Sequence, residues 1–302
     1  MDGPDRNLSE ADPLEEPRRG GRMWVFVINL DRDRARLARM IAEAERVGIS
    51  FERFAAVDGK NLGADLHDQF FSADGPHEPA LTAGEIGCYA SHLRIHKALA
   101  ELGECALVLE DDVRLSDDIV DAIEAARDCS ADWDIIRLSN ETKSVVLPVG
   151  NILGSRELVR YWTVPNGTGA YLISRTGAIK FLESYERRTL PVDEDLRRPW
   201  NCDLNTYGIL PPLVEPDVLD DSSIDSLGRD RRLPARDRFK DVRPFADAIA
   251  ATGYRFKTFG PVHFVRGVLQ SLAISVAKFV AGRRPARRFY RLSVRSLPRT
   301  MT

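Results

Sequence analysis

The chain has 302 residues, of which 43% are hydrophobic and 29% charged. This composition is ordinary for a soluble globular protein and excludes a wholly disordered chain or a collagen-like fibre. No uncharged apolar run reaches the roughly 18 residues that a membrane-spanning helix needs, which excludes a multi-span membrane protein. The net charge of −3 hides an asymmetry, because residues 262–302 carry nine Lys or Arg and no Asp or Glu, which leaves −12 for residues 1–261.

Three regions follow from these patterns. Residues 1–21 hold six acids, three arginines and no apolar run, so we expect a disordered leader and no secretory signal. Residues 22–261 are expected to form the folded domain, and residues 262–302 a basic tail. Four cysteines without a CxxC pair indicate free thiols in a reducing compartment, so the expected location is cytoplasmic. The basic tail adds the expectation of peripheral binding to the inner face of the cell membrane.

The first half of the domain is predicted to alternate strands and helices. Strands are expected at 23–30, 51–57, 105–109 and 134–138, and helices at about 31–48, 82–102 and 116–129. The helix at 82–102 has the strongest local signal, a capping box of Thr82 and Glu85. Such alternation predicts an α/β protein with an open, mostly parallel sheet and helices on both faces, with ligands at the carboxyl ends of the strands.

The second half is predicted to be richer in hairpins. Strands are expected at 144–149, 160–164 and 169–173, and the turn Asn166-Gly167 predicts a hairpin between the last two. Helices are expected at 174–185 and, in a short form, at 191–195. Two prolines restrict 208–214 to an edge strand or an extended loop. Residues 220–243 are charged and loop-like.

Two acidic clusters are candidates for chemistry. Glu110, Asp111 and Asp112 follow a wholly apolar strand, and a divalent cation would relieve the repulsion among three such carboxylates. Oxygen ligands of this kind suit Mg²⁺ or Mn²⁺, although a solvated turn that caps the next helix would give the same pattern. Asp193, Glu194 and Asp195 form the second cluster, in which a carboxylate could serve as a general base or merely occupy a first helical turn.

The pair His92 and His96 lies one helical turn apart. This spacing permits a zinc site, but no third ligand is evident, and buried core histidines give the same spacing. The sequence has no GxSxG motif, which argues against a serine hydrolase of the α/β type. It also has no P-loop and no GxGxxG motif, so ATP binding of the P-loop type and Rossmann dinucleotide binding lack their usual support.

The basic tail begins with an amphipathic pattern. Its apolar stripe consists of Val265, Leu269, Leu272, Val276 and Phe279, and an arginine-rich segment follows. Helices of this composition bind anionic membrane surfaces, although a helix packed on its own domain is the alternative. Nucleic acid is not expected as a partner, because the acidic body would repel it.

Read in order, the motifs resemble those of glycosyltransferase family 25, the bacterial lipopolysaccharide and lipooligosaccharide galactosyltransferases. The matching segments span about residues 23–223: Val27-Ile-Asn-Leu30 with Arg36, Phe54-Ala-Ala-Val-Asp-Gly59, residues 81–93 (LTAGEIGCYASHL), residues 107–113 (LVLEDDV), residues 167–174 (GTGAYLIS) and residues 191–196 (PVDEDL). The helix motif and the LEDD motif together are specific, whereas each strand motif alone is weak.

The resemblance implies a GT-A-like fold and an inverting transfer of a hexose, most often galactose, from a UDP-sugar to a glycolipid or oligosaccharide acceptor. Asp112 and Asp111 would bind Mn²⁺ or Mg²⁺ in place of a DxD motif. The expected donor contacts are Asn29, Arg36, Asp58, Ser91, His92, Glu110 and Asp111. The expected base is Asp195, with Asp193 second, since the family's PxDxDL pattern matches both.

Two other readings remain open from the sequence. A non-catalytic, peripheral membrane-binding protein could keep the transferase fold, but it would be expected to lose the acidic clusters, and both are present. A sugar nucleotidyltransferase is expected to have a glycine-rich phosphate-binding loop after the first strand. This chain has Asn29-Leu30-Asp31-Arg32 there, without a glycine, which counts against that class.

Overall fold

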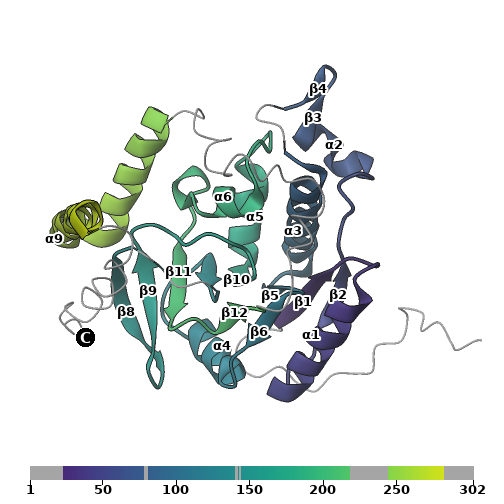
Figure 1. The fold of residues 1–302 in the computed structure, drawn as a ribbon, viewed down its shortest axis with the longest axis horizontal. Helices are drawn as coiled ribbons and strands as arrows, with labels where there is room; N and C mark the ends of the chain where they lie inside the picture. Colours follow the sequence, from purple (N-terminus) through teal and green to yellow (C-terminus); the bar gives the residue numbers. More distant parts are fainter. Residues whose placement is uncertain (1–22, 78–80, 140–141, 143, 218–243, 282–302) are drawn as a thin grey trace, which may run out of the picture.

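The structure is a computed structural model, and it describes residues 23–77, 81–139, 142, 144–217 and 244–281 (Figure 1). The predicted leader, the charged segment 220–243 and the tail beyond residue 281 lie outside the described residues. The strands are β1 (Met23–Asn29), β2 (Glu52–Ala55), β3 (Phe71–Ser72), β4 (Gly75–Pro76), β5 (Cys105–Glu110), β6 (Val113–Leu115), β7 (Ile135–Arg137), β8 (Val146–Leu153), β9 (Arg156–Tyr161), β10 (Ala170–Ser174), β11 (Thr206–Leu210) and β12 (Val214–Pro216). The helices are α1 (Arg34–Val47), α2 (Ala64–Phe70), α3 (Ala83–Leu102), α4 (Ile119–Arg127), α5 (Arg175–Glu183), α6 (Val192–Leu196), the 3-10 helix η1 (Pro199–Asn201) and α9 (Pro244–Ala281).

Eight strands form the central sheet in the order β2-β1-β5-β10-β7-β11-β9-β8. The pairs β1–β2, β1–β5 and β7–β11 are parallel, while β10 and β9 run antiparallel to both of their neighbours. All strands of this sheet except β10 and β9 therefore point the same way, which confirms the predicted α/β class with a mostly parallel sheet.

Side chains of successive sheet residues alternate between two cores. Phe26 and Val108 pack under α3 and α5, while Val27 and Leu107 pack against the layer that contains α1 and α4. Figure 1 shows α3, α5 and α6 over one face of the sheet and α1 and α4 over the other. Helices on both faces explain why β5 reads as a continuous apolar run in the sequence.

The best local signals in the sequence are confirmed. Helix α3 begins after Thr82, whose side chain and that of Glu85 form the complete capping box. The Ser174 hydroxyl accepts a hydrogen bond from the Gly177 amide and caps α5. Helix α1 ends at Gly48, whose positive φ of 73° is a conformation that glycine adopts without a steric penalty.

Two predicted features of the second half are wrong. Residues 160–164 do not pair with 169–173, because β9 pairs with β8 and β11 while β10 lies between β5 and β7. The real hairpin joins β8 to β9 through a turn at Gly154. The predicted edge strand is instead β11, which is internal to the sheet, and its two prolines follow the end of the strand, where they break no ladder bond.

Several short elements were absent from the prediction, among them α2 and β6. Helix α2 spans only seven residues and has no side-chain cap, but its residues Leu66 and Phe70, one turn apart, are buried in the core. Strand β6 pairs with β12, which lies about 100 residues later in the chain. No local sequence pattern therefore predicts β6. Both elements are stabilised by tertiary packing more than by local propensity.

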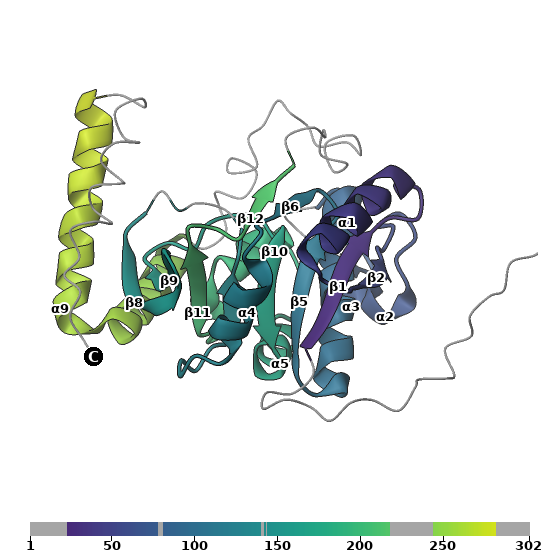
Figure 2. The same ribbon diagram turned by 90° about the horizontal axis from the view of Figure 1, so that it is seen from below.

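Helix α9 consists of two helical parts, because Gly260 has φ 68° and ψ 167° and Pro261 follows it. The break lies beside the predicted boundary between the domain and the basic tail. Figure 2 shows the second part as a column standing beside the β8 edge of the sheet. One face of this part packs on Trp162 through Phe264, Val268 and Ile274.

Candidate active site

A cleft opens at the carboxyl ends of β1 and β5, between the start of α1, the turn after β2 and the first half of α3. Seven of the ten predicted site residues line this cleft: Arg36, Asp58, Ser91, His92, Glu110, Asp111 and Asp112. Asn29 is buried and donates a hydrogen bond to Asp111, which lines the cleft. Asp193 and Asp195 are not among the lining residues. The sequence motifs thus converge at the edge of the sheet where ligands bind in α/β proteins.

Asp111 is fixed by two donors from β1 and α1. Its Oδ1 accepts a hydrogen bond from Arg36 Nη1 at 3.0 Å, and its Oδ2 accepts one from Asn29 Nδ2 at 2.7 Å. Asn29 in turn accepts a hydrogen bond from Arg53 Nε at 3.0 Å. Burial raises the pKa of Asp111, although these donors oppose the shift. The predicted donor contact Asn29 therefore orients Asp111, and both oxygens of Asp111 already have protein partners.

Asp112 is more available than its neighbour. Its Oδ2 lies 3.6 Å from Arg36 Nη1, and its side chain keeps 32% of its surface exposed. Burial, followed by the charge of Glu110, raises the pKa of Asp112 to about 6. A carboxylate that is costly to ionise and still open to the cleft favours a cation as its partner.

Glu110 closes the inner end of the cleft. Its Oε1 accepts a hydrogen bond from the Thr168 hydroxyl and lies 3.6 Å from His92 Nε2. Burial opposes ionisation of Glu110, but His92 and Thr168 outweigh it and lower the pKa of this carboxyl.

Ser91 and Asp58 hold the wall formed by the turn after β2. The Ser91 hydroxyl donates to the Gly87 carbonyl at 2.7 Å and accepts from the Val57 amide at 2.8 Å. Asp58 accepts from the Lys60 amide at 3.1 Å. Ser91 is fully buried, so its visible role is to join the turn to α3, whereas Asp58 keeps part of its surface in the cleft.

This wall depends on two glycines in close contact. A Cβ at Gly87 would lie 2.5 Å from the Val57 carbonyl oxygen, and one at Gly59 would lie 1.9 Å from that of Ala83. We expect Gly87→Ala to lower the free energy of unfolding by about 1–3 kcal/mol, because backbone must move to admit the methyl group. Gly253→Ala is the matched control: its Cβ meets no atom within 4 Å on an exposed helix, so it should stabilise by about 0.5–1 kcal/mol. Urea denaturation measures both, and equal midpoints for the two variants would contradict the packing argument.

His92 and His96 are joined by one tyrosine. The Tyr171 hydroxyl lies 2.7 Å from His92 Nδ1 and 2.9 Å from His96 Nε2, and both imidazoles are fully buried. Burial, followed by the charge of His92, lowers the pKa of His96 well below its usual value. The two histidines therefore do not share a metal, and His96 is a neutral core residue.

The second acidic cluster divides into an inward and an outward part. Asp195 is 3% exposed, and its Oδ2 accepts a hydrogen bond from the Tyr89 hydroxyl at 2.6 Å. Burial raises the pKa of Asp195 to about 7. Asp193 is half-buried, and its negative charge contributes to the raised pKa of Cys88. Burial, with Glu194 and Glu110, raises the pKa of Asp193 as well.

Sequence reasoning did not single out Arg137, although its guanidinium is fully buried at the end of β7. None of its three side-chain nitrogens has a hydrogen-bond partner among the described residues. It lies in register between Tyr171 and Gly208, and its charge opposes the rise in the pKa of Asp193. An arginine that ends an otherwise apolar strand is the signal that could have pointed to it.

Comparisons with known proteins identify the family of this chain. The family model described as Glycosyltransferase family 25 (LPS biosynthesis protein) matches residues 23–196, and the chain belongs to this family. The match begins at β1 and ends with α6, so it contains every residue of the predicted site.

Curated relatives carry different activities in their names. A "Glycosyltransferase 25 family member" of Drosophila pseudoobscura pseudoobscura is 33% identical over 57% of this chain and 29% of its own length. The "Procollagen galactosyltransferase 1" of Danio rerio is 31% identical over 59% of this chain and 31% of its own length. The "Probable inactive glycosyltransferase 25 family member 3" of Rattus norvegicus is 32% identical over 72% and 42%. The chain thus spans less than half the length of each of these three relatives.

A solved structure of the inositol-1-phosphate CTP transferase from T. maritima aligns with 74% of this chain and 99% of its own, at 12% identity and a TM-score of 0.24. At that score the likeness supports no conclusion about fold or activity.

Proposed function

We propose that the protein is an inverting glycosyltransferase that moves a hexose, with galactose the first candidate, from a UDP-sugar to a lipopolysaccharide, lipooligosaccharide or other glycan acceptor. The observation that carries the proposal is the run of three carboxylates at the end of β5, in a cleft with the partly exposed Asp112. A nucleotide diphosphate with a divalent cation complements such a site better than either charge does alone.

The donor set fits Mn²⁺ or Mg²⁺, because Asp112 offers an oxygen ligand whose ionisation is costly without a cation. Asp112 would hold the ion, while Asp111, whose oxygens are engaged by Asn29 and Arg36, would shape the site around it. When bound, the ion would neutralise charge on the leaving diphosphate. Arg36 and Asp58 line the same cleft and are the proposed contacts for phosphate and ribose.

Asp193 is the proposed base. An inverting transfer needs a carboxylate that removes the acceptor hydroxyl proton while that oxygen attacks the anomeric carbon. Asp193 keeps more of its surface exposed than Asp195, and its raised pKa makes it a stronger base than an ordinary aspartate. Asp195, the first choice from the sequence, is held by Tyr89 in the core, which supports a structural role for it.

The test is a panel of UDP-hexoses incubated with the protein and Mn²⁺, with released UDP as the readout. We expect UDP-galactose to be hydrolysed faster than the other donors, with activity lost in a chelator. No release of UDP from any donor would support the alternative of a non-catalytic protein. A relative with 32% identity, named "Probable inactive glycosyltransferase 25 family member 3", is the reason to test that alternative.

We also propose that the protein associates peripherally with the cytoplasmic face of an anionic membrane, where a lipid-linked acceptor would lie. In the second part of α9, the face away from Trp162 bears five exposed apolar side chains: Val262, Val265, Leu269, Leu272 and Val276, each 56% to 67% exposed. The basic residues of 262–302 supply charge that complements anionic lipid. No helix in the described ranges is long and apolar enough to cross a membrane.

Vesicle co-sedimentation tests this association. We expect the full chain to bind anionic vesicles and to lose about tenfold or more of that binding in high salt. The triple substitution Leu269→Ser, Leu272→Ser and Val276→Ser should weaken binding by a similar factor. The control is Phe245→Ser with Ile249→Ser, which removes exposed apolar side chains from the first part of α9. Binding of the triple variant equal to that of the native chain would contradict the proposed surface.

A further inference from the structure

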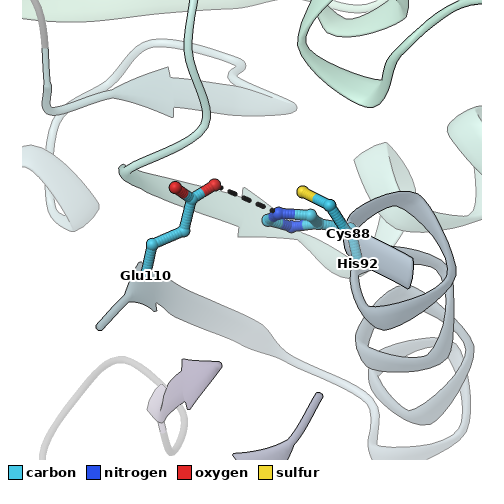
Figure 3. Close-up of side chains that lie close together, drawn as sticks. All are labelled: Cys88, His92 and Glu110. Atoms are coloured by element: carbon cyan, nitrogen blue, oxygen red, sulfur yellow. Dashed lines mark ion pairs between the residues drawn. The ribbon is translucent and has the colours of Figure 1, made fainter. Parts of the chain in front are cut away.

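Three side chains of different chemistry meet at the inner wall of the cleft. Cys88 and His92 lie one turn apart on the same face of α3, and Glu110 faces them from the end of β5 (Figure 3). One ligand atom from each lies within 4.8 Å of the others, and His92 Nε2 is 3.6 Å from Glu110 Oε1. Figure 3 shows the sulfur of Cys88 beside the imidazole edge that faces the carboxylate.

The imidazole is prepared to accept a metal. His92 Nε2 is fully buried and has no hydrogen-bond partner among the described residues, and its 3.6 Å separation from Glu110 is longer than a hydrogen bond. The other ring nitrogen contacts the Tyr171 hydroxyl, which also contacts His96. When Tyr171 donates to His96 it can accept from His92 Nδ1–H, and a metal that displaces the proton on Nε2 would then meet a lone pair facing Cys88 and Glu110. Metal-binding histidines are generally held in this way through the second nitrogen.

We propose that Cys88, His92 and Glu110 bind a zinc ion, and that zinc bound there inhibits the enzyme by occupying the donor cleft. Thiolate, imidazole and carboxylate are the ligands of zinc, whereas a thiolate is a poor ligand for Mg²⁺ or Mn²⁺. Tetrahedral zinc needs ligand atoms about 3.5 Å apart, so the histidine–glutamate pair at 3.6 Å fits as it stands, and no pair must close by more than about 1.3 Å. Coordination would release the Cys88 proton, and the Nε2 proton of a charged His92, to solvent, and a water could supply the fourth ligand.

The site is distinct from the proposed Mn²⁺ or Mg²⁺ ligand Asp112, but the two share one cleft. Glu110 cannot serve the donor while it holds zinc, which is why binding should inhibit. Zinc binding itself is independent of the proposed transferase activity, and only the inhibition rests on it.

Zinc affinity is measured first, on the full chain without donor or acceptor, by competition with a chromogenic chelator. We expect one zinc per chain, an affinity reduced about tenfold or more in Cys88→Ser, and no change in Cys129→Ser, which removes a free cysteine outside the cleft. Equal affinity in the native chain and Cys88→Ser would overturn the site, as would an equal loss in Cys129→Ser.

Cobalt gives a second readout that does not depend on any variant's folding. Co²⁺ bound to the native chain should show thiolate-to-metal charge-transfer absorption, which zinc then bleaches by displacement. Absence of this band at saturating Co²⁺ would overturn the assignment of Cys88.

Inhibition is measured last, as UDP release at saturating Mn²⁺ with rising zinc. The native chain should be inhibited over the range in which it binds zinc, and Cys88→Ser only at concentrations about tenfold higher. Zinc binding without inhibition would overturn the second half of the proposal. A chain inactive with every donor would contradict the proposed function, while the binding and cobalt measurements would still decide the site.

Discussion

Asp112→Asn is expected to abolish metal-dependent transfer and at the same time to stabilise the metal-free protein. Loss of the carboxylate removes the proposed cation ligand, and we expect turnover at limiting Mn²⁺ to fall by about 10²–10³-fold or more. The gain in stability has a separate cause. Burial and Glu110 raise the pKa of Asp112 to about 6 in the folded state, from about 4 in an unfolded chain, so its ionised form destabilises the fold at neutral pH.

The sign of the pH dependence follows from proton uptake. Between pH 4 and 6 the folded state binds more protons at Asp112 than the unfolded state does, so this group lowers stability as pH rises through that window. Asparagine removes the effect. After a discount for the exposed third of the side chain, we expect Asp112→Asn to raise the free energy of unfolding by about 1–2 kcal/mol at pH 7.5 in a chelator. The difference should shrink toward pH 4.

Chemical denaturation at the two pH values measures this change, and Asp118→Asn supplies a control of opposite sign. The bidentate contact of Arg156 lowers the pKa of Asp118 to about 2, so that carboxylate stabilises the fold above pH 4 and its loss should destabilise. Full turnover of Asp112→Asn at limiting Mn²⁺ would contradict the proposed metal ligand. A lower stability of Asp112→Asn in chelator would contradict the electrostatic argument.

Asp193→Asn is expected to lower kcat by about 10²–10⁴-fold, because the acceptor hydroxyl would lose its base. Donor binding should change little, since the residue lies outside the lining of the cleft. The raised pKa of Asp193 also predicts that kcat of the native enzyme falls on the acidic side at a pH above the usual range for an aspartate.

Asp195→Asn is the matched variant two positions along the same helix. An amide oxygen can still accept the hydrogen bond from Tyr89, so we expect kcat within about tenfold of the native value. Steady-state kinetics with saturating acceptor separate the two residues. A larger loss of kcat in Asp195→Asn than in Asp193→Asn would return the base to Asp195, and near-normal turnover in both would place it elsewhere.

Much of the cleft was predictable because its parts carry local signals. The capping box of Thr82 and Glu85 determined where α3 begins, and the apolar run of β5 determined where its carboxylates stand. Parallel strands bring their carboxyl ends to one edge, so β1 and β5 place their polar ends together without any further information.

The roles of individual side chains were less predictable. Sequence spacing could not show that the Asn29 amide donates to Asp111, or that Asp195 accepts from the Tyr89 hydroxyl. The role of each side chain depends on the hydrogen-bond partners that neighbouring helices and strands bring next to it. The buried charge of Arg137 was missed for the same reason, because one arginine in a short strand has no periodic pattern.

By itself the sequence determined the α/β class, the principal helices and the acidic edge of the sheet, because hydrophobic periodicity and capping act within a few residues. Only the tertiary structure decided that β10 lies between β5 and β7, and that β8 rather than β10 forms the hairpin with β9. Strand order depends on the burial of apolar side chains from segments that are far apart in the chain. A local Asn-Gly turn therefore does not determine which two strands pair. The same long-range packing brings Cys88 and His92 on α3 close to Glu110 on β5. The sequence of neither segment predicts this cluster by itself.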